Sequence, residues 1–405
     1  MKNKINSPLT RFRILSLFIS MLSIACLTIV VSAEAGFMTQ GTTQTPVASQ
    51  NVPAEKTVEQ VQKNIQVLNG LPVSQLIPVM NYMGSSLGVK CTYCHVRKDD
   101  KWDFVSDEKP EKGTAREMIK MVQGINKANF KGNPAVSCFT CHRGNHEPIR
   151  TPSLPIAEPT PFAEASPAAT GAPKETAPTA DQILAKYTEA LGGAAVIDKL
   201  KTRSMKGTWL TSNGMTFGYE VYQQSPNKMY TVLNTPKQGV IERGFDGQIG
   251  WEKSQRGLRD LQNQELIIMR RYPDLFKDIK LQGQFTRLVF GGKDKIDGKE
   301  VYVLRGLGID GKGERLYFDV LTGLLVRRIT TTPTIVGLIP EQVDYDDYRD
   351  VDGMKIPFTI RTTFIDSFYN STRKFTEIKL NVPVDETRFT KPPAPPPVPA
   401  KTPGL

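Results

Sequence analysis

Two short motifs of the same spacing carry residues that can hold haem covalently. They are Cys91–His95, with the sequence CTYCH, and Cys138–His142, with the sequence CFTCH. Two thiols separated by two residues can each form a thioether bond to one vinyl group of a single haem, and the histidine that follows can ligate the iron as the proximal ligand. The motifs therefore predict two covalently bound haem c groups. The attaching residues are Cys91, Cys94, Cys138 and Cys141, and the proximal ligands are His95 and His142.

Two other kinds of cysteine site fit these residues less well. Two C-x-x-C pairs can supply the four thiolates of a structural zinc site, but the histidine after each pair would then have no role. A disulfide framework also leaves both histidines unexplained. The fifth cysteine, Cys26, lies in an apolar N-terminal run and follows a poor lipobox, so lipidation is not expected.

The sixth iron ligands are limited by the number of histidines, which is three. The third, His146, is too close to His142 to reach the opposite face of the same haem, although it could approach the other haem. Sixth ligands must therefore come mainly from methionine, or be absent. A methionine pair precedes each motif: Met80 and Met83 precede the first, and Met118 and Met121 precede the second.

Each methionine pair falls on a predicted helix. Met80, Met83 and Leu87 have the spacing i, i+3, i+7, as do Met118, Met121 and Ile125, so each trio shares one helical face. Gly88 is a natural C-terminal stop for the first helix. Thr114, with Glu117 three residues later, predicts a capping box that starts the second helix just before Met118.

The residues around both motifs resemble the cytochrome subunit of photosynthetic reaction centres. The resemblance covers the haem segment and includes the run Met80 to His95, with Ser86-Leu87-Gly88-Val89, and the run from Ala115-Arg116-Glu117-Met118 through Cys138 to Gly144. It implies that Met80 and Met118 are axial ligands, with Met83 and Met121 packing nearby. The family's subunit holds four haems, one of them with two histidine ligands, whereas this chain has two motifs. We therefore expect a shortened member of the family.

Ligation by histidine and methionine raises the reduction potential, and a six-coordinate iron resists catalysis, so we expect an electron carrier rather than an enzyme. The resemblance implies that it re-reduces a photo-oxidised donor. The expected partners are redox proteins, either a membrane reaction centre or a respiratory complex. Three alternatives stay open: a respiratory electron donor, a haem enzyme such as a peroxidase, and a lipid carrier that acts through the C-terminal domain at a membrane surface.

The N-terminal residues 1–35 predict export. Basic residues precede the apolar run Ile14–Val31, and Ala33-Glu34-Ala35 offers small residues for cleavage, so this segment is a signal peptide or a membrane anchor. The prediction is a periplasmic protein, either free or anchored to the inner membrane. The formal charge of +11 includes this basic segment and omits the haem propionates, so no nucleic-acid partner is expected.

The chain has 405 residues, which is enough for two or three domains of about 150 residues each. Changes in composition divide the part after the N-terminal segment. We expect a tether (36–55), a mainly α-helical dihaem cytochrome c domain (56–150), a linker rich in proline and alanine (151–179), an antiparallel β domain (180–392) and a proline-rich tail (393–405).

Turn chemistry predicts the fold of the C-terminal domain. Stretches rich in β-branched and aromatic residues recur between pairs that favour hairpin turns: Asn213-Gly214, Asp246-Gly247, Asp297-Gly298, Asp310-Gly311 and Asp352-Gly353. We expect a helix over Asp181–Leu191, a helical interruption over Gln264–Phe276, and a curved sheet or half-barrel. The pattern weakly resembles the curved sheets of periplasmic lipoprotein carriers of the LolA and LolB type, which hold acyl chains on a concave apolar face.

Overall fold

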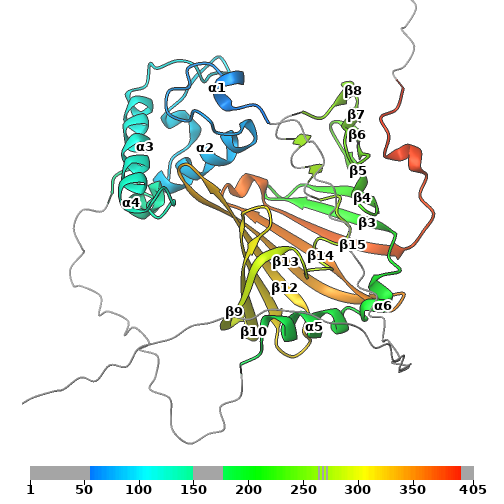
Figure 1. Cartoon of the computed structure of the whole chain (residues 1–405). Coiled ribbons are helices and arrows are strands. Elements are labelled where there is room, and N and C mark those ends of the chain that lie inside the picture. Colours follow the sequence, from blue (N-terminus) through cyan, green and yellow to red (C-terminus); the bar gives the residue numbers. More distant parts are fainter. Residues whose placement is uncertain (1–54, 149–176, 263–264, 267–268, 271, 394–405) are drawn as a thin grey trace, which may run out of the picture. The chain divides into compact units, whose positions relative to one another are not determined.

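The computed structural model describes residues 55–148 and 177–393, except for residues 263–264, 267–268 and 271. We call the first range the helical segment and the second the sheet segment (Figure 1). The predicted export signal, nearly all of the tether and linker, and all but the first residue of the proline-rich tail lie outside the described residues. In the part of the chain that is described, no helix combines the length and the hydropathy needed to cross a membrane.

The helical segment consists of helices and loops with one short hairpin. Its elements are α1 (Val58–Val61), α2 (Val73–Leu87), η1 (Cys91–Tyr93), β1 (Val96–Lys98), β2 (Lys101–Asp103), α3 (Pro110–Asn129) and α4 (Cys138–His142). Its core contains the apolar side chains of Val58, Leu68, Leu71, Val79, Tyr82 and Ile119. These residues come from α1, α2, α3 and the loop between α1 and α2, so the core joins both predicted ligand-bearing helices.

The end of α2 agrees with its prediction, and the start of α3 does not. Gly88 caps α2 in the left-handed conformation, with φ of 68°. The predicted capping box at Thr114 is wrong, because α3 already begins at Pro110, with Lys109 as the N-cap. Proline is favoured at the first helical position, since its φ is preset and its missing N–H would have no partner there. Thr114 instead donates to the Pro110 carbonyl at 3.3 Å.

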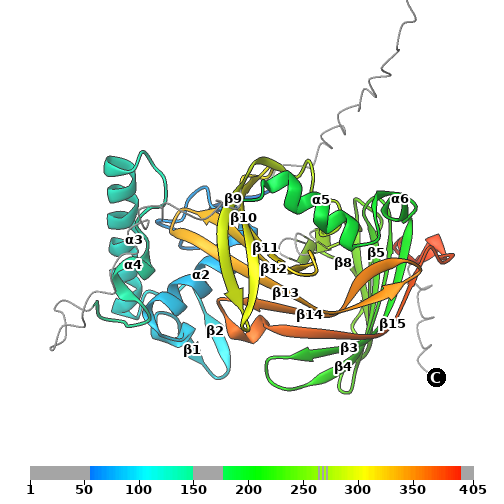
Figure 2. The ribbon, with the colours of Figure 1, turned by 90° about the horizontal axis from the view of Figure 1, so that it is seen from below.

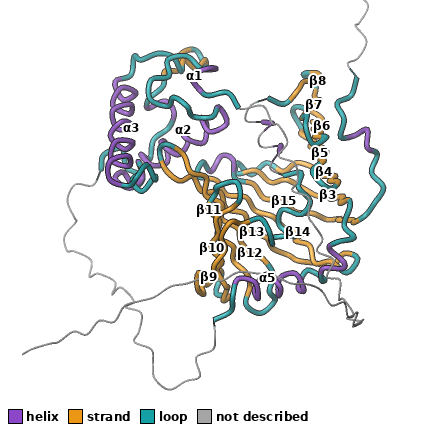
Figure 3. The backbone as a smooth tube through the Cα atoms, in the orientation of Figure 1, coloured by secondary structure: helices purple, strands orange, loops and turns teal. Residues whose placement is uncertain are grey.

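The sheet segment is built on one open antiparallel sheet, shown by the orange strands of Figure 3. Among the described residues the strand order is β8-β7-β6-β5-β4-β3-β15-β14-β13-β12-β11-β10-β9. The strands are β3 (Thr202–Thr211), β4 (Thr216–Gln224), β5 (Lys228–Thr235), β6 (Gly239–Phe245), β7 (Gly250–Ser254), β8 (Gly257–Asp260), β9 (Phe285–Ile296), β10 (Lys299–Gly308), β11 (Gly313–Asp319), β12 (Leu325–Thr334), β13 (Gly337–Val351), β14 (Met354–Phe364) and β15 (Ser371–Leu380). The predicted antiparallel sheet is therefore confirmed.

All five predicted turn pairs lie between consecutive strands. Asp297-Gly298 and Asp352-Gly353 have positive φ at both residues, as a type I′ hairpin turn requires. In the other three pairs only the glycine has a positive φ. The turns link neighbouring strands, but the pairing of β3 with β15 joins residues 160 or more positions apart and has no local signal in the sequence.

Helices and one long connection pack against the sheet. The helices are α5 (Ala180–Ala190) and α6 (Ala194–Ile197), and short 3-10 turns are η2 (Ser367–Tyr369) and η3 (Glu386–Arg388). Figure 2 shows the helix α5 beside the strand β9. The predicted helix over Asp181–Leu191 agrees with α5 to within one residue. Between β8 at one edge and β9 at the other, the chain crosses the sheet and buries Leu261, Leu275 and Leu281 in the main core. Of the interruption predicted over Gln264–Phe276, the described helical residues are Glu265, Leu266, Met269 and Arg270.

Candidate haem-attachment site

The first motif forms a single helical turn. The Tyr93 N–H donates to the Lys90 carbonyl at 2.9 Å, and the His95 N–H donates to the Cys91 carbonyl at 2.9 Å. In such a turn the positions i, i+3 and i+4 share one face. The turn therefore presents Cys91, Cys94 and His95 on one side, the arrangement that attachment and proximal ligation of one haem need.

The second motif is a helix in its own right, α4. Its N-cap is Ser137, whose backbone N–H donates to Thr140 Oγ1 at 3.0 Å. Cys138 and Cys141 are three residues apart on α4, and His142 is four residues after Cys138, so these three side chains also share one face. The two motifs thus repeat one local geometry, although one is a 3-10 turn and the other a short α-helix.

The four cysteines of the motifs are free, and each pair has one exposed thiol and one partly buried thiol. Cys91 and Cys141 are exposed. Burial raises the pKa of the Cys94 and Cys138 thiols, which disfavours the thiolates that a zinc site requires. Within the described ranges no three His, Cys, Asp or Glu side chains are grouped so that they could hold a metal ion.

The two proximal histidines have different surroundings. His142 Nδ1 lies 2.9 Å from the Asn145 carbonyl oxygen. Because a carbonyl oxygen can only accept, Nδ1 is the protonated nitrogen and Nε2 is left to bind a metal. His95 Nδ1 is buried and has no hydrogen-bond partner among the described residues. Its ring meets Phe104 edge-to-face, with centroids 5.2 Å apart.

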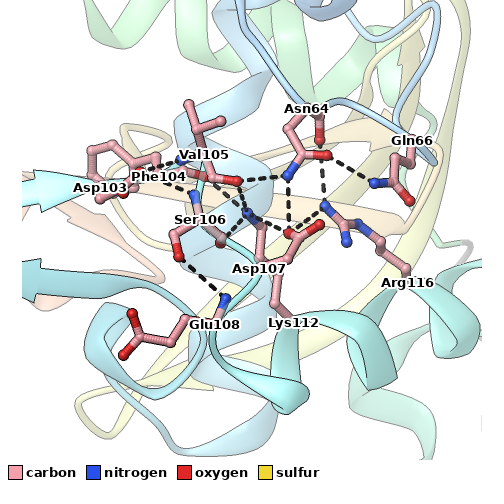
Figure 4. Close-up of polar contacts among 10 residues, drawn as sticks. All are labelled: Asn64, Gln66, Asp103, Phe104, Val105, Ser106, Asp107, Glu108, Lys112 and Arg116. Carbon is pink, nitrogen blue, oxygen red and sulfur yellow. Dashed lines mark hydrogen bonds and ion pairs between the residues drawn. The ribbon is translucent and has the colours of Figure 1, made fainter.

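A cluster of polar contacts holds the loop that carries Phe104 (Figure 4). Lys112 on α3 donates to the carbonyls of Phe104 at 2.9 Å and Ser106 at 2.8 Å. Asp107 receives hydrogen bonds from Arg116 and Asn64, each at 2.9 Å, and forms an ion pair with Lys112 at 3.0 Å. Arg116 and Lys112 hold the pKa of the Asp107 carboxyl well below its usual range. We call Asn64, Asp107, Lys112 and Arg116 the Asp107 cluster.

The two predicted sixth ligands differ in burial: Met80 on α2 is partly buried, and Met118 on α3 is exposed. Met80 and Met83 are partly buried against the core of the helical segment, where Cys138 also packs. On α3, Met118 and Met121 are 38% and 45% exposed, whereas Ile119 and Val122 are buried. The two methionines thus lie outside the buried face of α3, on a side that is free to contact a further group.

Several other large apolar side chains of the helical segment are exposed, which single-chain packing does not explain. They are Val61, Ile77, Trp102, Phe104, Val105, Phe130 and Phe139. Trp102 and Phe104 are stacked, with ring centroids 5.2 Å apart, so these two form a contiguous apolar patch, and such a patch often marks a binding surface. A haem has large apolar faces, so this surface, the free thiols and the available Nε2 of His142 fit covalently attached haem.

Sequence reasoning missed two contacts that fix the chain just before the second motif. Tyr82 on α2 donates a hydrogen bond to Ser137 Oγ at 2.8 Å. The Asn126 side chain on α3 donates to the Val136 carbonyl at 2.7 Å and accepts from the Val136 N–H at 2.9 Å. The burial of Asn126 could have been predicted from the sequence, because this polar residue continues the i, i+3, i+7 spacing of Ile119 and Val122 on one helical face.

The end of α2 also meets the loop after the second motif. The Gly144 N–H donates to the Ser86 carbonyl at 2.8 Å. Further along this loop, the His146 ring lies 6.3 Å from the ring of Tyr93, inside the first motif. His146 thus lies near the attachment sequence to which it does not belong.

Comparison with known proteins gives matches over this same part of the chain. Residues 27–180 match the family model of the photosynthetic reaction centre cytochrome C subunit. A cytochrome c-554 from Chloroflexus aurantiacus is 40% identical over 86 residues, which are 20% of this chain and 20% of that protein. A photosynthetic reaction center cytochrome c subunit from Roseobacter denitrificans is 34% identical over 101 residues, which are 23% of this chain and 27% of that protein. The chain thus matches only a fifth to a little over a quarter of these relatives' length.

A comparison of structures concerns the other half of the chain. A LolA superfamily protein from Nitrosomonas europaea is 15% identical, with a TM-score of 0.37, over 53% of this chain and 99% of that chain. At that TM-score the likeness says nothing about a ligand. For the part of the chain that carries both motifs, the predicted resemblance is confirmed: residues 27–180 are similar to the photosynthetic reaction-centre cytochrome c subunits.

Proposed function

We propose that this chain is a periplasmic electron-transfer protein with two covalently attached haem c groups. Cys91 and Cys94 would hold one haem, and Cys138 and Cys141 the other. A bound haem supplies one-electron chemistry, since its iron is stable in the ferrous and the ferric state. The observation that carries the proposal is the repeated turn that presents two thiols and a histidine on one face, in a segment similar to known cytochromes c.

The protein's own residues would set the properties of each site. His95 and His142 would ligate iron on one side, and Met80 and Met118 on the other. The Asn145 carbonyl fixes the orientation of the His142 ring, and Phe104 packs on that of His95. Burial is the main cause of the lowered pKa of His95, and the positive charge of Lys112 adds to it.

The partner would be a membrane redox complex on the periplasmic side. Similarity to reaction-centre subunits favours a photo-oxidised donor as the electron acceptor. The short match to those subunits leaves a respiratory complex as the second candidate. The two are distinguished by mixing the reduced protein with isolated reaction centres: flash-induced oxidation of the cytochrome supports the first candidate, and its absence, with oxidation by respiratory membranes, supports the second.

The number of haems and their ligands are tested together. Intact-mass measurement of the exported protein should give a mass increase of two haems, and Cys91→Ala/Cys94→Ala should leave one. A redox titration then compares the native protein with Met80→Ala and Met118→Ala, using Met83→Ala and Met121→Ala as controls on the same helices. We expect each ligand variant to lower one potential and each control to change little. A colourless protein overturns the proposal, and potentials unchanged in both ligand variants overturn the methionine assignment.

A further inference from the structure

The concave face of the sheet segment contains a cavity that the proposed electron transfer does not use. Its volume is about 680 Å³, within the range of small-molecule sites. Most of its lining comes from β3, β4, β5 and from β12 to β15. Much of that lining is apolar and buried, including Met205, Val221, Met229, Ile356 and Phe375. A cavity of this kind favours a ligand with a substantial hydrocarbon part.

Two buried polar groups at one place in this cavity have no acceptor in the described part of the chain. Trp209 on β3 and Arg373 on β15 are directly paired across the two strands. Trp209 Nε1 and Arg373 Nε are both buried, and neither has a hydrogen-bond partner among the described residues. Directly opposed residues in an antiparallel pair have Cβ atoms about 5 Å apart, so one group with two acceptor oxygens can reach both donors.

The charge at this place is also uncompensated. Arg373 Nη2 donates a hydrogen bond to Thr362 Oγ1 at 2.9 Å, and its guanidinium carbon lies 5.9 Å from the centroid of the Tyr272 ring. Within the described ranges no carboxylate forms an ion pair with Arg373. By contrast, Arg328 in the same cavity is paired with Asp278 and Glu314. A partly buried guanidinium without a counter-ion is costly, and a carboxylate is the group that matches its paired donors.

A second arginine increases the positive character of the cavity. Arg203 on β3 also lines it and donates to Gln223 Oε1 at 2.7 Å. Burial lowers the pKa of Arg203 to about 10; Asp278 opposes this shift, and the positive charge of Arg373 adds to it. The two guanidinium groups are thus close enough to repel each other, and an anion between the strands would relieve that repulsion.

Apolar side chains lie along β3 and β15 next to Trp209 and Arg373, where the hydrocarbon part of a bound ligand would extend. Along β3, Met205 is four residues from Trp209 on the same face, a separation of about 13 Å. Phe375 follows Arg373 by two residues on the same face of β15. We propose that this cavity binds a long-chain carboxylate, with the carboxylate on Arg373 and Trp209 and the hydrocarbon chain over the buried apolar side chains.

The test uses the full-length, haem-loaded protein and laurate as the probe, measured by titration calorimetry. Arg373→Gln removes the charged donor and should weaken binding between about tenfold and a hundredfold. Trp209→Phe keeps an aromatic ring at this position but removes the neutral Nε1–H donor, so it should weaken binding about twofold to tenfold. The matched control is Arg361→Gln on β14, because Arg361 is 44% exposed and pairs with Asp346. Laurate affinity should be unchanged in this control.

Further probes separate the carboxylate from other ligands. Dodecanol has the same tail without the charge, so it should bind more weakly and be insensitive to Arg373→Gln. The proposal is overturned if laurate does not bind saturably, if dodecanol binds as well, or if Arg361→Gln weakens binding as much as Arg373→Gln. It is also overturned if anionic phospholipid vesicles bind through Arg373 while free laurate does not. Should Arg373→Gln fail to fold, Trp209→Phe serves as the test: weaker laurate binding than in the native protein supports the proposal, and unchanged binding overturns it.

Discussion

The hydroxyl of Tyr82 donates a hydrogen bond of 2.8 Å to the hydroxyl of Ser137, which immediately precedes Cys138. Tyr82 lies between Met80 and Met83 on α2, and its side chain is buried in the core of the helical segment. The helix that carries one predicted iron ligand therefore also fixes the start of the other haem's attachment turn. This contact connects the helix that precedes the first motif to the start of the second motif.

Removal of the Tyr82 hydroxyl should loosen this connection. Tyr82→Phe keeps the ring in the core but removes the hydrogen bond to Ser137 Oγ, so we expect the free energy of unfolding to fall by about 1 kcal/mol. Thermal unfolding followed by circular dichroism measures the change. A double-mutant cycle with Ser137→Ala isolates the contact, and a coupling energy near zero would show that the two hydroxyls contribute independently.

Asn126 should contribute more than Tyr82, because it satisfies two backbone groups. Asn126→Ala leaves the N–H and the carbonyl of Val136 without partners in a partly buried place, which should cost about 1–3 kcal/mol. The control is Asn129→Ala on the same helix, whose side chain is exposed and donates only to the Ile125 carbonyl. Denaturant unfolding should separate the two variants clearly; equal effects would contradict the role given to Asn126.

Gly88 should tolerate no side chain, for a reason beyond its left-handed backbone. A Cβ at Gly88 would lie 2.1 Å from the Gly144 carbonyl oxygen, so two backbone segments would have to separate. Gly132 has a similar φ of 80° but nothing within 4 Å of its Cβ position. Gly132→Ala should therefore cost about 1–2 kcal/mol from backbone conformation alone. Gly88→Ala should cost distinctly more and reduce haem incorporation.

Haem content per purified chain, read from absorbance, tests this difference. If Gly88→Ala and Gly132→Ala have the same stability and haem content, the close approach of Gly88 to Gly144 is not important to the fold.

Local signals predicted local features of this chain correctly. Gly88 ends α2, and the five turn pairs lie between strands, because a positive φ is a property of the residue itself. The start of α3 was predicted wrongly, since a threonine followed by a glutamate is weaker evidence than a proline at the first helical position. The haem ligands predicted from the motifs remain predictions that the redox titration tests.

Long-range contacts could not be predicted from these patterns. Tyr82 and Ser137 are 55 residues apart, and β3 pairs with residues that are 160 or more positions away. The periodicity of each strand predicts which face is buried but not which strand lies beside it. The resemblance to lipoprotein carriers predicted a concave apolar face, but the place where Trp209 and Arg373 meet depends on the pairing of β3 with β15, which no sequence pattern predicted.

The Asp107 cluster should respond to acid in a defined direction. The folded pKa of Asp107 is below its ordinary value of 3.8. The contribution of the ionised carboxyl to stability is therefore fully present above that value and is lost as the pH falls through the lower, folded pKa. Asp107→Asn removes this contribution, so its stability difference from the native protein should be constant from pH 5 to 8, as the linkage relation requires, and should shrink in stronger acid.

Unfolding measured at a series of pH values checks this prediction. Because Asp107 is exposed to solvent, added salt should also reduce the difference. If the two proteins were equally stable from pH 5 to 8, Asp107 would have an ordinary pKa, and Arg116 and Lys112 would not stabilise its charge.

The ion pair of Glu314 and Arg328 should be essential to the sheet segment. Both side chains are buried, with 6% and 7% exposure, and Glu314 accepts from Arg328 at 3.0 and 3.1 Å. Glu314→Ala leaves the guanidinium buried with only Asp278 as a charged partner. Breaking a buried pair from one side costs about 3–5 kcal/mol. Calorimetric unfolding should show a corresponding fall in the melting temperature.

An exposed ion pair in the same sheet provides the comparison. Glu300 pairs with Lys293 at 3.8 Å, and both side chains are about half exposed. Exposed pairs contribute about 0–1 kcal/mol, because water screens the charges and the long side chains lose conformational freedom. Glu300→Ala should therefore change stability by no more than about 1 kcal/mol. If Glu314→Ala were equally mild, the sheet segment would relax around Arg328 or admit water to it, and the buried pair would not be essential to the fold.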